Sequence, residues 1–322
     1  MNSNINIEES SNDKLWDQFV LKSYNKNFYS FSDILNLEKK HKKFFVYKNE
    51  EIIASFNIII ENDKIVLPKY NLYSPINYKL LSGTKLSSLN SIQFIINSEI
   101  NDFLLKNFKK IYISYDYCTN DIRPFTWHGY PDISKSYKIR VKYTYLSNIK
   151  NLNENNFSKS EIYLNSSETN RREIRNSLNK KYKFLELFSK EIFFSLKNSS
   201  YNIHKKNFNE EYYEKVFSVF KKLHEKKLIK MYVTFKNDTP VFMTMYSLIS
   251  NKSIFLHSGR SNNIDNKNLI SVFSMFKSFI ELSKLGIEKL DFEGMNSPNN
   301  SKSKIKFGGQ LLPYYILELN KD

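Results

Sequence analysis

The chain has 322 residues, a net charge of +16, 41% hydrophobic residues and 16% aromatic residues. This composition excludes a disordered chain, and the length suits two domains of roughly 150 residues each. The positive charge fits nucleic acid, an anionic membrane surface or a phosphorylated substrate, but the lysines are scattered, and an AT-rich genome would produce the same excess of Lys, Asn, Ile, Tyr and Phe.

Several classes of site and segment are not expected. The single cysteine, Cys118, excludes an internal disulfide, and the five histidines include no pair three to five residues apart, so no metal is predicted. The N-terminus is polar and acidic, unlike a signal peptide, and the longest uncharged apolar stretch, 239–251, is too short to span a bilayer. We therefore expect a cytoplasmic protein, with peripheral contact at the inner face of the membrane left open.

The first half of the chain alternates between helical and strand-like patterns. An amphipathic helix is predicted near 14–24, and it is followed by the strand-like runs FFVYKN, EIIASFNIII and KIVLPKY. Apolar residues then recur at helical spacing over 88–108, and IYISYDY after them reads as a buried strand. A further strand, YKIRVKYTYL, precedes residue 150.

The second half repeats this order. Helical spacing over 213–223 is followed by strands within 230–260, a helix over 269–284, and the strands IEKLDFE and LLPYYILEL. The turn at 48–50 can be laid over the turn at 236–238. The sequence therefore predicts a mixed α/β (α+β) protein of two similar domains, 1–150 and 151–322.

A basic helix is predicted between the two copies, within NSSETNRREIRNSLNKKYKF. Arg171 and Arg175 lie one turn apart on one face, which suits bidentate recognition of phosphate. A solvated surface helix explains the same charges, so both interpretations stay open. The segment 182–207 is expected to be strand-like and carries no sustained heptads.

Together, three segments and the duplicated order carry a family resemblance. The segments are DIRPFTWHGYPDISKSYKIRVKYTYL, ETNRREIRNSLNK and LDFEGMNSPNNSKSKIKFGGQLLPYYILEL. The chain resembles the FemAB-like acyltransferases, which are tandem members of the GCN5-related N-acyltransferase (GNAT) superfamily. The resemblance implies two GNAT-like domains, each a mixed, mostly antiparallel sheet flanked by helices. It also implies transfer of an acyl group from acyl-CoA or aminoacyl-tRNA to an amine, often in cell-envelope glycan or peptidoglycan synthesis.

Four of the seven glycines lie within 286–309, around a strand that carries two carboxylates. Strand alternation puts Asp291 and Glu293 on one face, where a partly buried carboxylate is a candidate base for the amine proton. Strand-end residues paired to lysines are the alternative. Gly308 and Gly309 would let the backbone approach a ligand, and the loop 295–304 would close over the substrate.

Further candidates depend more on the resemblance. His257 ends a strand and is a candidate base or substrate contact, although a structural histidine explains it as well. The resemblance places a basic residue such as Lys304 or Lys306 near a substrate phosphate or the developing charge. Only Gly259 and Arg260 match the loop that holds the CoA pyrophosphate in related enzymes, so the identity of the acyl donor stays open.

We therefore predict an N-acyltransferase with its active cleft in the C-terminal domain. Acyl-CoA is the expected co-substrate, and an amino sugar or another envelope precursor is the expected acceptor. The alternatives are an aminoacyl-tRNA-dependent transferase, a non-catalytic protein that binds RNA or another anion, and an inert scaffold.

Overall fold

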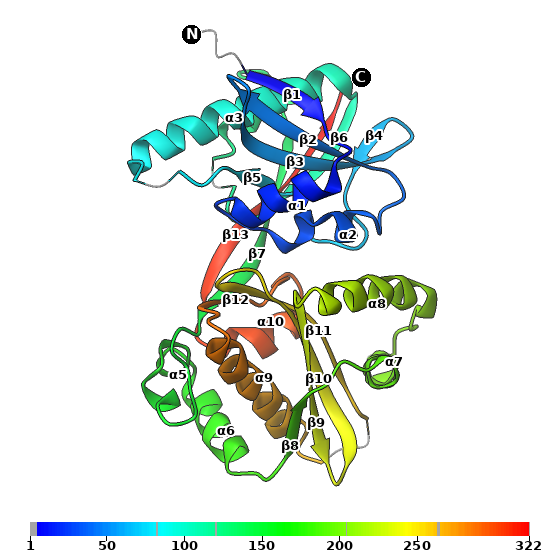
Figure 1. Ribbon diagram of the computed structural model, residues 1–322, viewed down its shortest axis with the longest axis vertical. Helices are drawn as coiled ribbons and strands as arrows, with labels where there is room; N and C mark the ends of the chain where they lie inside the picture. Colours follow the sequence, from blue (N-terminus) through cyan, green and yellow to red (C-terminus); the bar gives the residue numbers. More distant parts are fainter. Residues whose placement is uncertain (1–4, 82, 120, 204, 263–264, 322) are drawn as a thin grey trace. The chain divides into compact units, whose positions relative to one another are not determined.

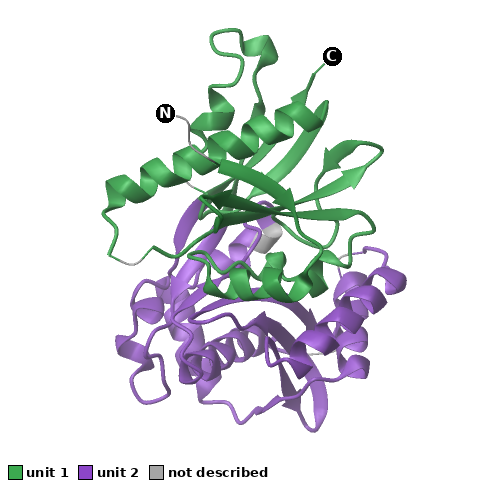
Figure 2. Cartoon of the chain, turned by 45° about the horizontal axis from the view of Figure 1, so that its top comes forward, with its two compact units in different colours: residues 1–143, 313–322 green, residues 144–312 purple. Residues whose placement is uncertain are grey.

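The computed structural model describes residues 5–81, 83–119, 121–203, 205–262 and 265–321. The chain forms two compact units, shown in different colours in Figure 2. Unit 1 contains Met1–Tyr143 and Pro313–Asp322, and unit 2 contains Thr144–Leu312. The division at residue 150 made from the sequence assigned the last ten residues to the second domain, whereas the compact units place them with the first.

Unit 1 is built on antiparallel strands. Its five-stranded sheet has the order β1-β2-β3-β4, with β5 also paired to β3. The strands are β1 (Ile5–Glu9), β2 (His41–Lys48), β3 (Glu51–Glu61), β4 (Lys64–Val66) and β5 (Ile76–Tyr78). A further strand, β6 (Lys110–Tyr115), pairs with the end of the last strand of the chain, β13 (Gln310–Asn320).

The long helix of unit 1 supplies much of its core. Ile96, Ile100 and Leu104 recur every four residues in α3 and are buried, as the helical spacing predicts. Phe103 of the same helix contacts the rings of Phe44 and Phe56 at 5.0 and 5.9 Å between centroids. The α-helices of this unit are α1 (Asp13–Lys22), α2 (Ser32–Leu35), α3 (Leu86–Asn107) and α4 (Arg123–Thr126).

Unit 2 contains most of the second sheet, whose strands run in the order β6-β13-β7-β12-β11-β10-β9-β8. Among the described pairs from β7 to β8, β11–β12 is parallel and the other four are antiparallel. The strands are β7 (Lys138–Asn148), which begins in unit 1, β8 (Lys183–Glu186), β9 (Ile229–Lys236), β10 (Thr239–Ser247), β11 (Lys252–Arg260) and β12 (Lys289–Asp291). The sheet is therefore mixed and mostly antiparallel.

Helices cover this sheet on both sides. Figure 1 shows α6 and α9 on one side and α7 and α8 on the other. On the α9 side, Phe279 packs against Phe292, and Phe292 stacks on Phe307 at 5.8 Å. The helices of this unit are α5 (Glu161–Leu164), α6 (Glu168–Leu178), α7 (Lys190–Ile203), α8 (Glu210–Glu225), α9 (Lys267–Lys284) and α10 (Pro298–Ile305).

The predicted fold class and the repeated order are confirmed. In unit 1 the order α1, β2, β3, β4, α3, β6 matches α8, β9, β10, β11, α9, β12 in unit 2. The equivalent hairpin turns also have the same backbone conformation, since Asn49 and Glu50 have φ of 48° and 67°, and Asn237 and Asp238 have φ of 51° and 57°. Two consecutive left-handed residues are typical of the type I′ turn that joins twisted antiparallel strands.

Two local predictions were wrong. The run IFFSL belongs to α7 rather than to a strand, because Phe193, Leu196 and Lys197 recur at helical spacing and bury one face. The predicted loop 295–304 contains α10, which begins at Pro298. Proline is well suited to the first turn of a helix, where its missing N–H is not needed.

The described residues contain neither a membrane-spanning helix nor a cluster of metal ligands. No helix among them combines the length and the apolar character needed to cross a membrane. Within the same residues, His, Cys, Asp and Glu form no group of three placed to hold a metal ion.

Candidate active site

The candidate site lies where two parallel strands of unit 2 part. β12 pairs with β11 only from Lys252↔Lys289 to Ile254↔Asp291, whereas β11 continues to Arg260. The chain leaves β12 through two consecutive left-handed residues, Glu293 at φ 55° and Gly294 at φ 46°. A glutamate in this conformation is strained, and such strain is often found at functional positions.

Glu293 is the candidate base at this point. Its side chain is partly buried, and burial raises its pKa from the ordinary value of 4.5 to about 8, although nearby Lys304 opposes the shift. The alternation argument that put Glu293 on the same strand face as Asp291 was wrong, because β12 ends at Asp291. The left-handed turn, rather than the strand, determines where this carboxyl group lies.

Lys304 comes to the same place from α10. Its Nζ donates a hydrogen bond of 2.5 Å to the backbone carbonyl of Glu293 and lies 5.7 Å from the centre of the Phe255 ring. Burial lowers the pKa of Lys304, while the carboxylates of Glu293 and Asp291 oppose that change. The site therefore combines a carboxyl group that gains a proton easily with an ammonium group that loses one easily.

Asp291 supports this geometry from inside the sheet. It is buried, and its Oδ1 accepts hydrogen bonds from the Thr144 hydroxyl and, at 2.8 Å, from the backbone N–H of Glu293. It therefore fixes the turn that carries Glu293. A positioning role explains these contacts better than proton transfer to a substrate.

Replacing Asp291 by Ala should lower the free energy of unfolding by roughly 1–3 kcal/mol, because buried donors lose their acceptor. Thr144→Val removes one of those donors and serves as the matched partner in a double-mutant cycle followed by urea unfolding. The double variant should lose less stability than the sum of the two single changes. Strict additivity would contradict the proposed link between Asp291 and Thr144.

His257 lies in a different cluster. Its ring packs among Phe193, Tyr213 and Phe220, with centroid distances of 5.5 to 5.8 Å. These rings come from α7 and α8, whereas Phe255 packs with Phe292 on the α9 side. Burial, together with the nearby Lys197 ammonium, lowers the pKa of His257 well below its usual value. His257 thus resembles a neutral core histidine, and its catalytic role stays a prediction.

Gly259 and Arg260 lie within β11 rather than in a loop. A Cβ on Gly259 would stand 2.8 Å from the carbonyl carbon of Leu196, so this glycine lets α7 pack directly on the strand. The backbone N–H of Arg260 donates to the Ser200 hydroxyl at 2.8 Å. These contacts give both residues a role inside the fold, and their binding of a cofactor stays a prediction.

The four basic residues predicted to bind substrate or phosphate divide between two places. Arg171 and Arg175 lie on α6, where Arg175 donates to the Tyr163 hydroxyl. Lys306 forms an ion pair of 3.1 Å with Glu173 of the same helix. Lys304 is the basic residue that meets Glu293. The side chain of Lys306 is therefore directed to α6 rather than to the carboxylate site.

In the described residues, Gly308 and Gly309 pack closely against other segments of this chain. A Cβ on Gly308, which has φ 60°, would stand 2.5 Å from the carbonyl carbon of Asn165. A Cβ on Gly309 would stand 2.5 Å from the Ser147 hydroxyl, and its N–H donates to the Tyr145 hydroxyl at 2.7 Å. These glycines fix the position of the chain after α10, and ligand contact by them stays a prediction.

Sequence reasoning missed Thr144 and Phe255 as neighbours of the site. Thr144 lies in β7 and Asp291 in β12, so their contact depends on strand pairing. Phe255 was counted only as a strand residue. Thr144 is one of several polar residues in β7, so the sequence offered no local signal that set it apart.

The fold has clear relatives among solved structures. FemX has a TM-score of 0.64 to this chain, with 10% sequence identity over 96% of both chains. The chain has a FemAB-like tandem GNAT fold. L-PGS from Bacillus licheniformis matches this FemAB-like fold with a TM-score of 0.55 and 11% identity, covering 98% of this chain and 93% of its own. A tandem GNAT protein from the clavulanic acid biosynthesis pathway matches at 0.50 and 5% identity, over 98% of both chains.

By sequence, this chain matches no protein-family profile and no curated protein. At sequence identities this low, the structural likeness establishes the fold of the chain and not its chemistry.

Proposed function

We propose that this protein is an N-acyltransferase whose reaction takes place at the parting of β11 and β12 in unit 2. The observation that carries the proposal is the meeting of Glu293 and Lys304, two ionisable groups with opposed pKa shifts. Shifts of this kind are typical of acid–base sites, where a group must exchange protons near the working pH. The FemAB-like fold supports the same reaction class.

The proposed step forms a C–N bond and breaks the bond between the acyl carbon and its carrier. The acceptor amine attacks the carbonyl carbon of the donor, and the ionised Glu293 carboxylate takes the proton that the nitrogen loses. The carrier then leaves from the tetrahedral intermediate with the bonding electrons and receives a proton from Glu293. We assign to the Lys304 ammonium, which is held at the Glu293 backbone, the role of stabilising negative charge that develops during this exchange.

The acyl donor is proposed to be acyl-CoA, and the acceptor is proposed to be an amine of an amino sugar or another envelope precursor. The choice of acyl-CoA is supported by the FemAB-like GNAT resemblance and by the segment 182–207, whose described residues contain the strand β8 and the 14-residue helix α7. Related enzymes that use aminoacyl-tRNA often carry a long helical arm in the second domain.

Aminoacyl-tRNA is a second candidate donor because of the basic surface near α6. Arg172, Lys180 and Lys181 are exposed at this helix and the residues that follow it. Exposed cations of this kind neutralise backbone phosphates, which gives nucleic-acid binding a steep dependence on salt.

Thermal unfolding at fixed salt tests the donor. A ligand at 100 times its dissociation constant adds about 2.7 kcal/mol of stability, which raises the midpoint by several degrees. Acetyl-CoA or a longer acyl-CoA should produce that rise. If no CoA raises the unfolding midpoint and charged tRNA binds more tightly than uncharged tRNA, aminoacyl-tRNA becomes the proposed donor. Salt-sensitive RNA binding without any transfer would overturn the enzymatic proposal.

A further inference from the structure

A short segment of unit 1 holds three large apolar side chains in solvent. Trp127, Tyr130 and Ile133 are 56%, 81% and 86% exposed, although they lie within seven residues of one another. Single exposed apolar residues are ordinary, but a cluster of this kind often marks an interaction surface. We call residues 127–133 the apolar loop.

The base of the apolar loop is firmly anchored. Phe125 is fully buried and packs between Tyr115 and Tyr137, at 5.2 and 5.9 Å between ring centroids. The amide of Asn101 on α3 donates to the carbonyl of Pro124 at 3.1 Å. The fold therefore already has a core residue at this point and does not need the exposed side chains for stability.

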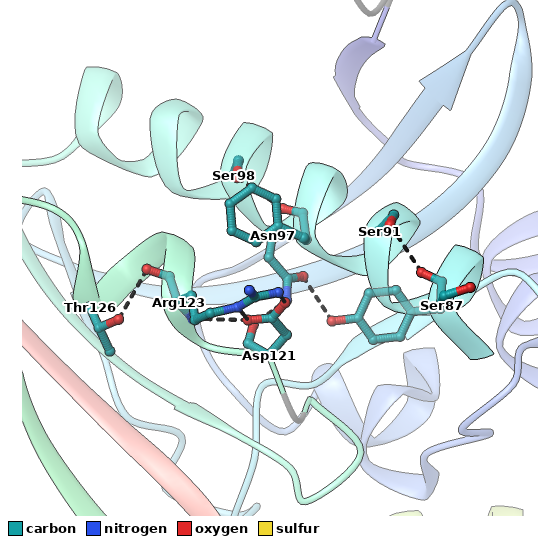
Figure 3. A network of polar contacts seen from close by, with 9 residues as sticks. Ser87, Ser91, Asn97, Ser98, Asp121, Arg123 and Thr126 are labelled. Carbon is teal, nitrogen blue, oxygen red and sulfur yellow. Dashed lines mark hydrogen bonds and ion pairs between the residues drawn. The ribbon is translucent and has the colours of Figure 1, made fainter.

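An ion pair fixes the entry to the loop, as Figure 3 shows. Arg123 donates to both carboxylate oxygens of Asp121, at 2.8 and 2.6 Å, and Asn97 of α3 donates to the Asp121 carbonyl at 2.8 Å. The Arg123 guanidinium also lies 5.0 Å from the Phe94 ring and 5.6 Å from the Trp127 ring. Trp127 is thus held on one side while more than half of it faces solvent.

Hydrogen bonds and close backbone packing also hold the C-terminal end of the apolar loop. Asp132 accepts hydrogen bonds from the backbone N–H and the hydroxyl of Ser134, at 3.0 and 2.6 Å. Gly129 has φ 80° and lies against the backbone of Lys135. A Cβ on Gly129 would stand 2.8 Å from the carbonyl carbon of Lys135. The exposed side chains are therefore presented by a loop that is ordered before any partner binds, which reduces the entropy that binding would cost.

The surrounding charge identifies the kind of partner. Residues 121–143 contain five basic residues, Arg123, Lys135, Lys138, Arg140 and Lys142. Three of them form ion pairs, with Asp121, Asp132 and Glu318, so two positive charges remain in excess. Trp and Tyr rings beside Lys and Arg are characteristic of the interface between lipid headgroups and acyl chains. Three side chains on a short loop also offer much less area than the roughly 1,200 Å² that specific protein interfaces bury.

We propose that the apolar loop attaches this protein to an anionic membrane surface, with Trp127, Tyr130 and Ile133 inserted among the headgroups and the basic residues facing the lipid phosphates. This proposal is independent of the transfer reaction. It requires no membrane-spanning helix.

Tryptophan fluorescence tests the proposal directly. The chain has two tryptophans, and Trp16 is fully buried, so Trp127 is the reporter. Vesicles of phosphatidylglycerol and phosphatidylcholine should shift its emission to the blue, and brominated acyl chains should quench it. Phosphatidylcholine alone should do neither. Emission that stays unchanged with the anionic vesicles at low salt would overturn the proposal.

Two double variants distinguish binding by the apolar loop from nonspecific electrostatic attraction of the protein to lipid. Tyr130→Ser with Ile133→Ser keeps the Trp127 reporter and should lower vesicle co-sedimentation at least tenfold. The control, Leu80→Ser with Leu285→Ser, removes two residues that are 53% and 50% exposed elsewhere and should bind as the wild type does. Equal binding by all three proteins would show that charge alone attracts the chain to lipid and would overturn the role of the loop. Thermal unfolding verifies that each variant is folded.

Discussion

Replacement of Glu293 by Gln is expected to lower kcat/KM for acyl transfer at least 100-fold, with the fold retained. The amide keeps the size of the side chain but cannot accept the amine proton, and general base catalysis contributes about 10²–10⁴-fold to rates. Steady-state transfer of a labelled acyl group to the acceptor measures the loss. Glu288→Gln is the matched control, because Glu288 lies in the same unit beside β12 and forms an ion pair with Lys150 at 2.9 Å.

The pH dependence distinguishes loss of a base from misfolding. With a pKa of about 8, Glu293 is mostly protonated at neutral pH, so wild-type kcat/KM should rise about tenfold per pH unit below 8 and level off above it. The folded protein also holds this proton more tightly than the unfolded chain. The free energy of unfolding should therefore fall as pH rises from 5 to 8, and the variant should lack that decline. A Glu293→Gln enzyme with wild-type activity would refute the assignment of the base.

Replacement of Gly308 by Ala should be the most damaging single methyl addition in unit 2, costing about 2–5 kcal/mol of unfolding free energy. The left-handed backbone at φ 60° contributes roughly 1–2 kcal/mol, and overpacking contributes about 1–3 kcal/mol. The overpacking arises because the new Cβ would stand 2.5 Å from the carbonyl carbon of Asn165 and 2.6 Å from the backbone nitrogen of Ser166. Urea unfolding measures the change.

Gly294→Ala provides the control for the contact with Asn165. Gly294 also has positive φ, at 46°, but a Cβ there would meet no atom within 4 Å. Its substitution should therefore cost only about 1–2 kcal/mol, the backbone contribution alone. Equal losses for the two variants would mean that the close packing of Gly308 against α5–α6 does not contribute to stability.

Much of the fold could be predicted from local patterns. The four-residue spacing of Ile96, Ile100 and Leu104 predicts α3, and the paired turns at 48–50 and 236–238 predict the repeat, because these signals depend on neighbours in sequence. The helix α7 was missed because its large aromatic residues also suit a strand. The return of β13 to unit 1 depends on pairing between residues 315–320 and 110–115, which no local pattern records.

The site could be predicted only in part. Glu293 and Lys304 were both candidates, but a strand alternation rule cannot foresee that β12 ends at Asp291 and that the next residues turn left-handed. His257 was grouped with them because it ends a strand of the repeated unit that was expected to face the same cleft. Its packing among Phe193, Tyr213 and Phe220 depends on helices whose contacting residues lie 37 to 64 residues earlier in the sequence. Gly308 and Gly309 suggested a ligand, whereas the atoms they approach belong to β7 and to the segment before α6.

The most direct test of the central claim is a carbon-13 NMR titration of the glutamate side-chain carboxyl groups between pH 4 and 10, which requires neither donor nor acceptor. The account predicts a glutamate resonance that titrates near pH 8 and is absent from the Glu293→Gln protein. If the resonance lost in the variant titrates below pH 5, Glu293 is an ordinary carboxylate, and the proposed base must be sought elsewhere.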